Sequence, residues 1–518
     1  MPKMRRFLRH CVLVAFSFLL LEGCSGRQRP ASLSIGGRTS QGTISEHSTS
    51  SEKTAEEMYQ RGLDSISGRG MCSDPERARQ WFEEAAAKGH PGAELALGLI
   101  YAEGFGVEQD HAKAALWIHR SASHGNKWAQ SNLASLYWQG KGVRQDRTLA
   151  FQWGLKAART GVPEAQETVA WCFKEGIGTA KNPSEAAHWM KKAADAGRPS
   201  AQATLGVFYQ VGFGVKADPR KALACFQKAA DQGYPRGQYN LALCYYYGSG
   251  TEKDMSLAFK FLKGAAEGGH RLSFELLAYM YRQGLGTSQD FAQARFWYGK
   301  AADLGNPNAA VELAGLYARG QGGPIDLRES YRLNCQAALT GFPLAMANVG
   351  NALYTGFGVD RNPAEALYWL RLAAEAQEMG AVNDLGDAYE TGQGVEPDIN
   401  RAVALYQISA RTGHPSGAVS LGYLYMEGKG VAKDWAMAAQ CFEYASVRED
   451  PRAMRLLGKM VLNGWGGPAN LPEAYMWFRL AEQRHDQEAT VLLNDLLPQM
   501  TAEQVAAGEL AARTWKER

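Results

Sequence analysis

The sequence predicts an all-α solenoid of about twelve two-helix repeats. Three observations predict it: a Gly-x-Gly motif that recurs every 36 residues, an Asp or Asn that recurs with the same period, and an apolar pattern between them that suits helices. Repetition with a fixed period of roughly 20–50 residues is typical of solenoids, in which each unit packs only against its neighbours. The chain has 518 residues, more than one compact core usually holds, which also favours an extended array.

The glycine motif keeps its spacing through the whole repeat region. Its first glycine stands in order at Gly68, Gly104, Gly140, Gly176, Gly212, Gly248, Gly284, Gly320, Gly356, Gly392, Gly428 and Gly464, and its second glycine follows two residues later each time. Glycine readily takes the left-handed conformation that ends a helix. The motif is therefore predicted to end the first helix of each repeat, helix A, and to form the turn into the second, helix B.

The recurring Asp or Asn marks the start of helix B. It occupies Asp74, Asp110, Asp146, Asn182, Asp218, Asp254, Asp290, Asp326, Asn362, Asp398, Asp434 and Asn470. Side-chain oxygens of these residue types accept hydrogen bonds from the free backbone N–H groups of a first helical turn. In four repeats Pro follows directly, at the first helical position, where its missing N–H costs nothing.

The apolar residues between these markers fall on single helical faces. Helix B carries Ala and, three residues later, Trp in seven repeats, as at Ala186 and Trp189. Helix A carries a small residue, Leu and an aromatic at four-residue steps, as at Ala201, Leu205 and Tyr209. Such spacings predict amphipathic helices, and we expect the Trp to fill the groove that small Ala residues leave between helices.

Together these elements resemble a known repeat. Ala-x-x-x-Leu-Gly-x-x-Tyr-x-x-Gly-x-Gly-Val, followed by Asp-x-x-x-Ala-x-x-Trp-x-x-x-Ala-Ala, is similar to the Sel-1-like repeat, a relative of the tetratricopeptide repeat, over residues 55–483. The resemblance implies a right-handed superhelix whose A helices line the concave, binding face, and a non-catalytic scaffold for protein–protein interaction. Local departures include Gln377 and Glu449, which stand where other repeats have the Gly that ends helix B.

The N-terminal segment resembles an export signal. A basic start and a short apolar run over residues 1–23 are typical of a signal peptide, and Leu21 to Cys24 resemble the lipobox of bacterial lipoproteins. That resemblance implies lipid attachment at Cys24 and anchoring to the cell envelope, at the outer membrane because Ser25 is not Asp. The alternative is ordinary cleavage with an incidental cysteine. Residues 24–54, rich in Ser, Thr, Gly and Gln, are predicted to be a disordered tether.

The C-terminal segment, residues 484–518, is predicted to be a helical cap over the last repeat. Thr501 and Gln504 match a capping box at the start of a final helix. A solenoid needs such a cover because its terminal repeat otherwise exposes an apolar face.

Neither a cofactor, a metal site nor a catalytic site is predicted. With residues 1–23 removed, 52 basic and 52 acidic side chains remain, which argues against a nucleic-acid partner. The histidines lack metal-ligand spacing, and the repeating Asp residues are accounted for by helix starts. Cys225 and Cys244 lie on adjacent predicted helices, so either a disulfide or two free core thiols are open.

Ligand contact is predicted on helix A at two variable positions. One carries the amides Asn132, Asn240 and Asn348, and the other carries the aromatics Trp138, Tyr246 and Tyr354. Amides interspersed with aromatics suit an extended peptide or a glycan such as peptidoglycan. The alternative is that these positions are solvated or packed against neighbouring helices.

Three functions remain in view. The first is a monomeric scaffold, an envelope lipoprotein presenting its concave surface to other proteins. The second is an envelope enzyme related to peptidoglycan or β-lactam chemistry, and the third is a surface-exposed factor for host contact built on the same scaffold.

Overall fold

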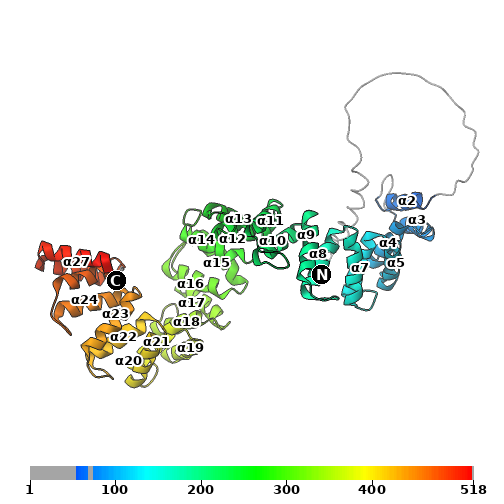
Figure 1. The fold of residues 1–518 in the computed structure, drawn as a ribbon. Helices are drawn as coiled ribbons and strands as arrows, with labels where there is room; N and C mark the ends of the chain where they lie inside the picture. The colour runs from blue at the N-terminus through cyan, green and yellow to red at the C-terminus, as the bar shows by residue number, and fades with distance from the viewer. Residues whose placement is uncertain (1–53, 68–73, 516–518) are drawn as a thin grey trace, which may run out of the picture. The chain divides into compact units, whose positions relative to one another are not determined.

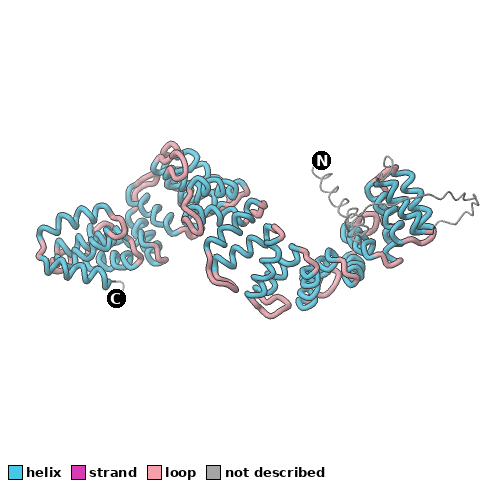
Figure 2. Tube along the Cα trace, turned by 90° about the horizontal axis from the view of Figure 1, so that it is seen from above, coloured by secondary structure: helices cyan, strands magenta, loops and turns pink. Residues whose placement is uncertain are grey.

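The computed structural model describes residues 54–67 and 74–515, and every regular element in these ranges is a helix (Figures 1 and 2). The helices alternate with short loops and follow one another in chain order. This confirms the predicted all-α solenoid. The predicted signal peptide at residues 1–23, Cys24, and residues 25–53 of the predicted tether lie outside the described residues.

Helix A of the successive repeats has nearly constant length. In order, it is α2 (Ala55–Ser67), α4 (Pro91–Glu103), α6 (Lys127–Gln139), α8 (Pro163–Glu175), α10 (Pro199–Val211), α12 (Pro235–Tyr247), α14 (Ser273–Gln283), α16 (Pro307–Arg319), α18 (Pro343–Thr355), α20 (Met379–Thr391), α22 (Pro415–Glu427) and α24 (Pro451–Asn463).

Helix B follows each A helix after a loop. In order, it is α3 (Pro75–Ala87), α5 (His111–Ser123), α7 (Arg147–Arg159), α9 (Pro183–Asp195), α11 (Pro219–Asp231), α13 (Met255–Glu267), α15 (Phe291–Asp303), α17 (Leu327–Ala338), α19 (Pro363–Glu375), α21 (Ile399–Arg411), α23 (Trp435–Val447) and α25 (Leu471–Glu482).

The predicted helix caps are confirmed. Each of the Asp or Asn residues expected before a B helix accepts a backbone N–H of the first turn through its side chain; Asp218, for example, accepts from the Lys221 N–H at 3.0 Å. The end of helix B takes the left-handed conformation one or two residues after the C-cap, normally at glycine. Gln377 (φ 64°), Glu449 (φ 64°) and His485 (φ 65°) adopt the same conformation without being glycine. The backbone geometry of the repeat therefore overrides residue preference at these three positions.

Replacing Gln377 with Gly should stabilise the end of α19 by about 0.5–1 kcal/mol. A left-handed non-glycine residue costs about 1–2 kcal/mol, and the greater freedom of glycine in the unfolded chain offsets about half of that gain. Ala376→Gly is the matched control, because Ala376 has φ −81° and no such strain to relieve. Hydrogen exchange of the α19 amides is the measurement; stabilisation by both variants, or by neither, would contradict the argument.

The deepest core position is not the Trp position that the sequence analysis favoured. Trp189, Trp297 and Trp477 are buried, but Trp81, Trp117, Trp153 and Trp369 are only half-buried. The residue after the Trp position points straight between helices A and B, and it supplies most of the largest fully buried side chains, among them Phe82, Phe226, Tyr298, Tyr406, Phe442 and Phe478. The Trp side chain instead packs at the edge of this contact.

A small residue on helix A faces this deep position in each repeat. A Cβ built on Gly206 would lie 2.4 Å from the Phe226 ring, and one on Gly386 would lie 2.5 Å from the Tyr406 ring. Where helix A carries Ala170 instead, helix B carries the flexible Met190. In these repeats the facing residues are matched in volume at one point of closest approach. The match is not strict along the array, because Ala278 and Tyr298 occupy the same two positions and share one buried cluster.

The second glycine of the Gly-x-Gly motif joins successive repeats. A Cβ on Gly214 would lie 1.9 Å from the carbonyl oxygen of Pro183, the first residue of the preceding repeat's B helix. Gly250 meets Pro219 in the same way, at 2.3 Å. The motif therefore does more than turn the chain, because its second glycine lets one repeat approach the next.

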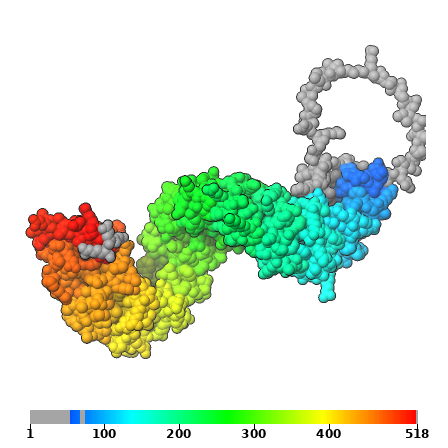
Figure 3. All heavy atoms as spheres, viewed as in Figure 1, coloured from blue at the N-terminus to red at the C-terminus, as the bar shows by residue number. Residues whose placement is uncertain are grey.

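Packing in the array is local. The substantial contacts between described helices join elements of the same or adjacent repeats, and in Figure 3 the colours follow chain order without mixing. Beyond direct neighbours along the chain, consecutive A helices also touch: α10 with α12, α16 with α18, α18 with α20, and α20 with α22. The B helices of the described repeats show no contact of this extent between them, so the A helices form the more crowded face.

The C-terminal helices cover the last repeat. α26 (Gln487–Leu496), the 3₁₀ helix Leu497–Gln499 and α27 (Ala502–Thr514) follow α25. The predicted capping box is confirmed, since the Thr501 side chain accepts from the Gln504 N–H and the Gln504 side chain accepts from the Thr501 N–H. α27 packs on α25, with Trp515 set edge-on to Trp477 at 5.7 Å. The apolar face of the final B helix is thereby buried.

Candidate binding surface on the A helices

The predicted ligand-contacting residues all lie on A helices and are half-buried. Asn132 and Trp138 lie on α6, Asn240 and Tyr246 on α12, and Asn348 and Tyr354 on α18. Each Asn lies on the same helix as one aromatic residue, and the next such pair follows 108 residues later in the chain. The six residues therefore do not form one compact site.

The aromatic members of this set make structural contacts. Trp138 packs on the next core cluster, and the Arg147 guanidinium lies 4.0 Å above its ring. The Tyr354 hydroxyl donates to the carbonyl oxygen of Gln393 at 2.8 Å, which ties two repeats together, and burial raises the pKa of Tyr354 to about 12. Tyr246 packs against a core cluster and its pKa is raised, mainly by burial. Truncating these rings would therefore disturb packing as well as any ligand contact.

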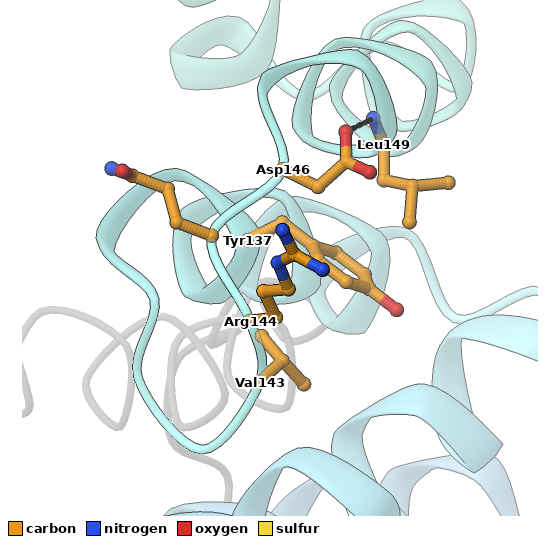
Figure 4. Close-up of a pocket in the computed structure, with 6 residues that line it drawn as sticks. Tyr137, Val143, Arg144, Asp146 and Leu149 are labelled. Atoms are coloured by element: carbon orange, nitrogen blue, oxygen red, sulfur yellow. Dashed lines mark hydrogen bonds between the residues drawn. The ribbon is translucent and has the colours of Figure 1, made fainter.

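The first hollow worth testing as a site lies in the loop between α6 and α7 (Figure 4). Tyr137, Arg144 and Asp146 line it. The Asp146 carboxylate is already engaged as a helix cap, accepting from the N–H groups of Thr148 and Leu149 at 2.9 Å each. The equivalent Asp or Asn caps a B helix in the other repeats as well, so Asp146 is accounted for by the fold.

A second hollow, which we call the α16–α18 groove, lies on the A-helix face. Its volume is about 530 Å³, and it is lined by residues of α14, α16, α17, α18 and the loop after α18. Asn334 of α17 forms its floor; this buried amide donates to the Ser330 carbonyl oxygen at 2.9 Å and accepts from Asn348 Nδ2 at 3.0 Å. Of the six predicted contact residues, Asn348 alone lines this groove.

The groove exists because two side chains on α16 are unusually small. Gly315 and Ala318 line it where neighbouring A helices carry larger groups; Trp171, Tyr279 and Tyr423 hold the position equivalent to Gly315. A Cβ on Gly315 would meet only the end of the Arg319 side chain, at 3.0 Å. Sequence reasoning missed Gly315, although its signal was present: a glycine at a variable helix A position that is large in most repeats.

Charge in the groove comes from two arginines and one carboxylate. The Arg282 guanidinium forms an ion pair with Glu312. Arg319 forms no ion pair with the described residues; its Nε donates to Gln321 Oε1 at 3.0 Å, and the rest of the guanidinium lies over Gly315. The lining therefore has one uncompensated positive charge, and it also includes the exposed apolar side chains Leu344 and Phe357.

The next repeat presents carboxylates on the same face. The Tyr406 hydroxyl, rising between α20 and α21, lies 2.6 Å from Asp387 Oδ1 and 2.8 Å from Glu390 Oε2. A phenol has one proton to donate, so both contacts are hydrogen bonds only when one carboxyl carries a proton. The Asp387 side chain is exposed to solvent on one side, and the protein atoms packed on its other side exclude water. This partial desolvation, aided by Asp384 and Glu390, raises the pKa of Asp387 to about 6.

Asp387→Asn should make the α20–α21 pair more stable at pH 7.5 and leave it unchanged near pH 3.5. The folded pKa of about 6 lies above the ordinary value of 3.8, so the folded state holds more protons between these values and wild-type stability falls as pH rises through this window. Hydrogen exchange of α20 and α21 across this range is the measurement. Tyr406→Phe serves as the comparison. It keeps the aromatic ring, as Phe226 does at the equivalent position of another repeat, and removes the hydroxyl that contacts Asp387. An Asn advantage that is equal at both pH values would show that the carboxylate's titration plays no part.

The described cysteines are free thiols, including Cys225 and Cys244. Burial raises the pKa of Cys172, Cys244 and Cys441 to about 11 each. No group of three or more His, Cys, Asp or Glu side chains suited to a metal ion occurs in the described part of the chain. Among the same residues, no helix is long and apolar enough to cross a membrane.

The recurring helix pairs and neighbour-only packing define an α-solenoid built from helix-turn-helix repeats. The family model described as the Sel1 repeat matches twelve successive segments, at residues 53–90, 91–126, 129–162, 163–197, 199–234, 235–270, 275–306, 307–341, 343–377, 381–414, 415–446 and 451–486. The chain therefore belongs to the Sel1 repeat family. Each segment corresponds to one A helix and one B helix.

A solved structure of similar sequence shows the same architecture. The chain is similar to c5321, described as a protective antigen present in uropathogenic Escherichia coli strains and displaying an SLR fold, with 29% identity, a TM-score of 0.75, and coverage of 85% of this chain and 94% of that chain. A Sel1 repeat protein from Oxalobacter formigenes has 28% identity and a TM-score of 0.47, covering 60% of this chain and 96% of that chain. The search of curated proteins gave no match.

Proposed function

We propose that this protein is a non-catalytic scaffold that binds other proteins through its A-helix face. The observation that carries the proposal is the α16–α18 groove, a hollow of about 530 Å³ on the face where consecutive A helices crowd together. Its volume is within the range of about 300–1,000 Å³ that is usual for ligand sites. Sel1 and tetratricopeptide-like repeats generally serve as protein-interaction modules, which supports the same function.

The state of the cysteines also favours binding over catalysis. A thiol acts as a nucleophile in its thiolate form. With a pKa of about 11, Cys172, Cys244 and Cys441 hold their protons at neutral pH. They serve as small apolar core residues.

Photo-crosslinking from two matched tyrosines tests the scaffold proposal. Tyr247 on the A helix α12 is 65% exposed, and Tyr368 on the B helix α19 is 58% exposed. Each is replaced in turn by p-benzoylphenylalanine in cells that produce the full chain. Crosslinked protein adducts are expected from position 247 and not from position 368. Equal yields from the two positions, or adducts from 368 alone, would count against the A-helix face as the binding surface.

We also propose that the scaffold is held at the bacterial outer membrane by lipid on Cys24. The basic and apolar residues 1–23 and the lipobox-like Leu21 to Cys24 support this proposal. More than one acyl chain is needed for stable anchoring, and lipidation of the lipobox type supplies them. Radiolabelled palmitate should enter the wild-type protein and not Cys24→Ser, and the variant should leave the membrane fraction. Membrane retention of an unlabelled Cys24→Ser protein would refute lipid anchoring.

One comparison favours a second candidate, display on the outside of the cell. The similar protein c5321 is described as a protective antigen. If this chain faces outward in the same role, protease added to intact cells should cleave it. Protection in intact cells and cleavage after the outer membrane is opened would assign it to the periplasmic side instead.

A further inference from the structure

We infer that the α16–α18 groove takes a carboxylate-bearing residue, flanked by apolar residues, from an extended polypeptide segment. The inference rests on the proposed scaffold function and specifies the kind of partner that this site accepts. Three properties of the groove carry it: its shape, its uncompensated charge and its apolar rim.

The shape suits a chain segment rather than a folded surface. Gly315 and Ala318 leave a concave space over α16, and α17 closes it below with the Asn334 amide. A space of about 530 Å³ holds a few residues and no folded domain. On the α18 side, the exposed Asn351 and Thr355 line the mouth of the groove. Asn351 donates one amide proton to Asp384 at 2.8 Å, and the Thr355 hydroxyl donates to the Asn351 carbonyl oxygen at 2.8 Å. The Asn351 amide oxygen and its second N–H are left to pair with an extended backbone, and the Thr355 oxygen can still accept.

The charge of the groove selects an acidic group. Glu312 neutralises Arg282, which leaves the exposed Arg319 without an opposite charge. Its planar guanidinium lies over Gly315, inside the groove, where a carboxylate can accept two hydrogen bonds from it. A basic side chain at this place would meet the positive charge of Arg319, and Glu312 is already paired with Arg282. The other carboxylate beside the groove, Asp384 of α20, accepts from the Asn351 amide at 2.8 Å on the α18 side.

The rim provides the apolar contacts on either side. Leu344 at the start of α18 is 44% exposed, and Phe357 in the loop after α18 is 46% exposed. Val311 adds a further apolar wall. Apolar side chains that flank the carboxylate would cover this surface and remove it from water. The groove thus combines one charge-specific point with apolar contacts around it.

Three blocked pentapeptides test the inference on the folded chain. The probes are acetyl-Ala-Leu-Glu-Leu-Ala-amide, its Gln analogue and its Lys analogue, with dissociation constants measured by titration at low salt. The Glu peptide should bind at least about tenfold more tightly than the Gln peptide, which corresponds to one charge-assisted pair. The Lys peptide should bind more weakly still. Equal binding of the Glu and Gln peptides, or no binding of either at millimolar concentration, would overturn the inference.

Two variants assign the effect to the groove. Arg319→Gln should abolish the preference for Glu over Gln, whereas Arg328→Gln, which removes the same charge from an exposed position on the B helix α17, should retain it. Gly315→Phe should abolish binding of all three peptides by filling the groove. Its fold should survive, because Trp171, Tyr279 and Tyr423 occupy the same helical position elsewhere, and unchanged thermal melting checks this. Glu-peptide binding that persists in folded Gly315→Phe would exclude the groove.

The two levels of the proposal can fail separately. Adducts from position 247 combined with peptide binding that ignores Arg319 and Gly315 would leave the scaffold function in place and reject the groove. Absence of adducts from position 247 combined with no peptide binding that depends on Arg319 and Gly315 would reject the A-helix face itself.

Discussion

Gly214→Ala should destabilise the contact between two repeats by about 2–4 kcal/mol. The left-handed backbone of Gly214 (φ +66°) costs a Cβ-bearing residue about 1–2 kcal/mol, of which the greater freedom of glycine in the unfolded chain offsets about half. The new Cβ would also lie 1.9 Å from the carbonyl oxygen of Pro183. Because that oxygen belongs to the backbone at the start of α9, it cannot rotate away, and relieving the overlap adds roughly 1–3 kcal/mol.

Gly233→Ala separates the two effects. Gly233 has the same left-handed conformation (φ +71°), but nothing lies within 4 Å of a Cβ built on it. Its replacement should therefore cost only the net backbone term, about 0.5–1 kcal/mol. Hydrogen exchange of α9 to α12 measures both variants under the same conditions. Equal losses in the two variants would show that the close approach to Pro183 contributes nothing.

This glycine position bears on function because it controls how repeats approach one another. The groove between α16 and α18 depends on the spacing of consecutive A helices, which are positioned through these inter-repeat contacts. In the loop after α16, a Cβ built on the second glycine, Gly322, would lie 2.4 Å from the carbonyl group of Phe291. A substitution there is expected to alter the groove without touching any residue that lines it.

Phe226→Ala should cost about 3–5 kcal/mol, the range for deleting a fully buried aromatic ring. Phe226 is 0% exposed and its ring packs directly on Gly206. In an array held by neighbour contacts, the loss should be concentrated in the repeats on either side. Hydrogen exchange that loosens uniformly from α2 to α27 would contradict this local picture.

A double-mutant cycle tests whether the two helices are matched in volume. Gly206→Ala alone should destabilise by about 2–3 kcal/mol, because its Cβ meets the Phe226 ring at 2.4 Å. Combined with Phe226→Met, it reproduces the Ala170–Met190 pair of an earlier repeat. The double variant should then lose less than the sum of the single losses. Strict additivity would mean that the facing residues are not coupled.

The candidate site shows where sequence reasoning reached its limit. The variable positions on helix A were recognised, and Asn348 does line the groove. Trp138 and Tyr354 were recognised by their chemistry as well, yet the structure engages both in contacts between helices. Gly315 has no side chain whose chemistry could indicate ligand contact. The hollow forms because Gly315 leaves space on α16, and the walls of the hollow come from helices of three repeats.

The sequence by itself determined the repeat. The period of 36 residues, the capping Asp and Asn residues and the helix-ending glycines act within a few residues of chain, so local physical chemistry is enough to predict the order, length and ends of the helices. Only the tertiary structure decided which residues become core and which form a surface for binding. Phe226 rather than the neighbouring Trp position fills the centre, and Arg319 stays unpaired while Arg282 is neutralised. These outcomes depend on distances between helices, which follow from packing in three dimensions and not from the spacing of residues along the chain.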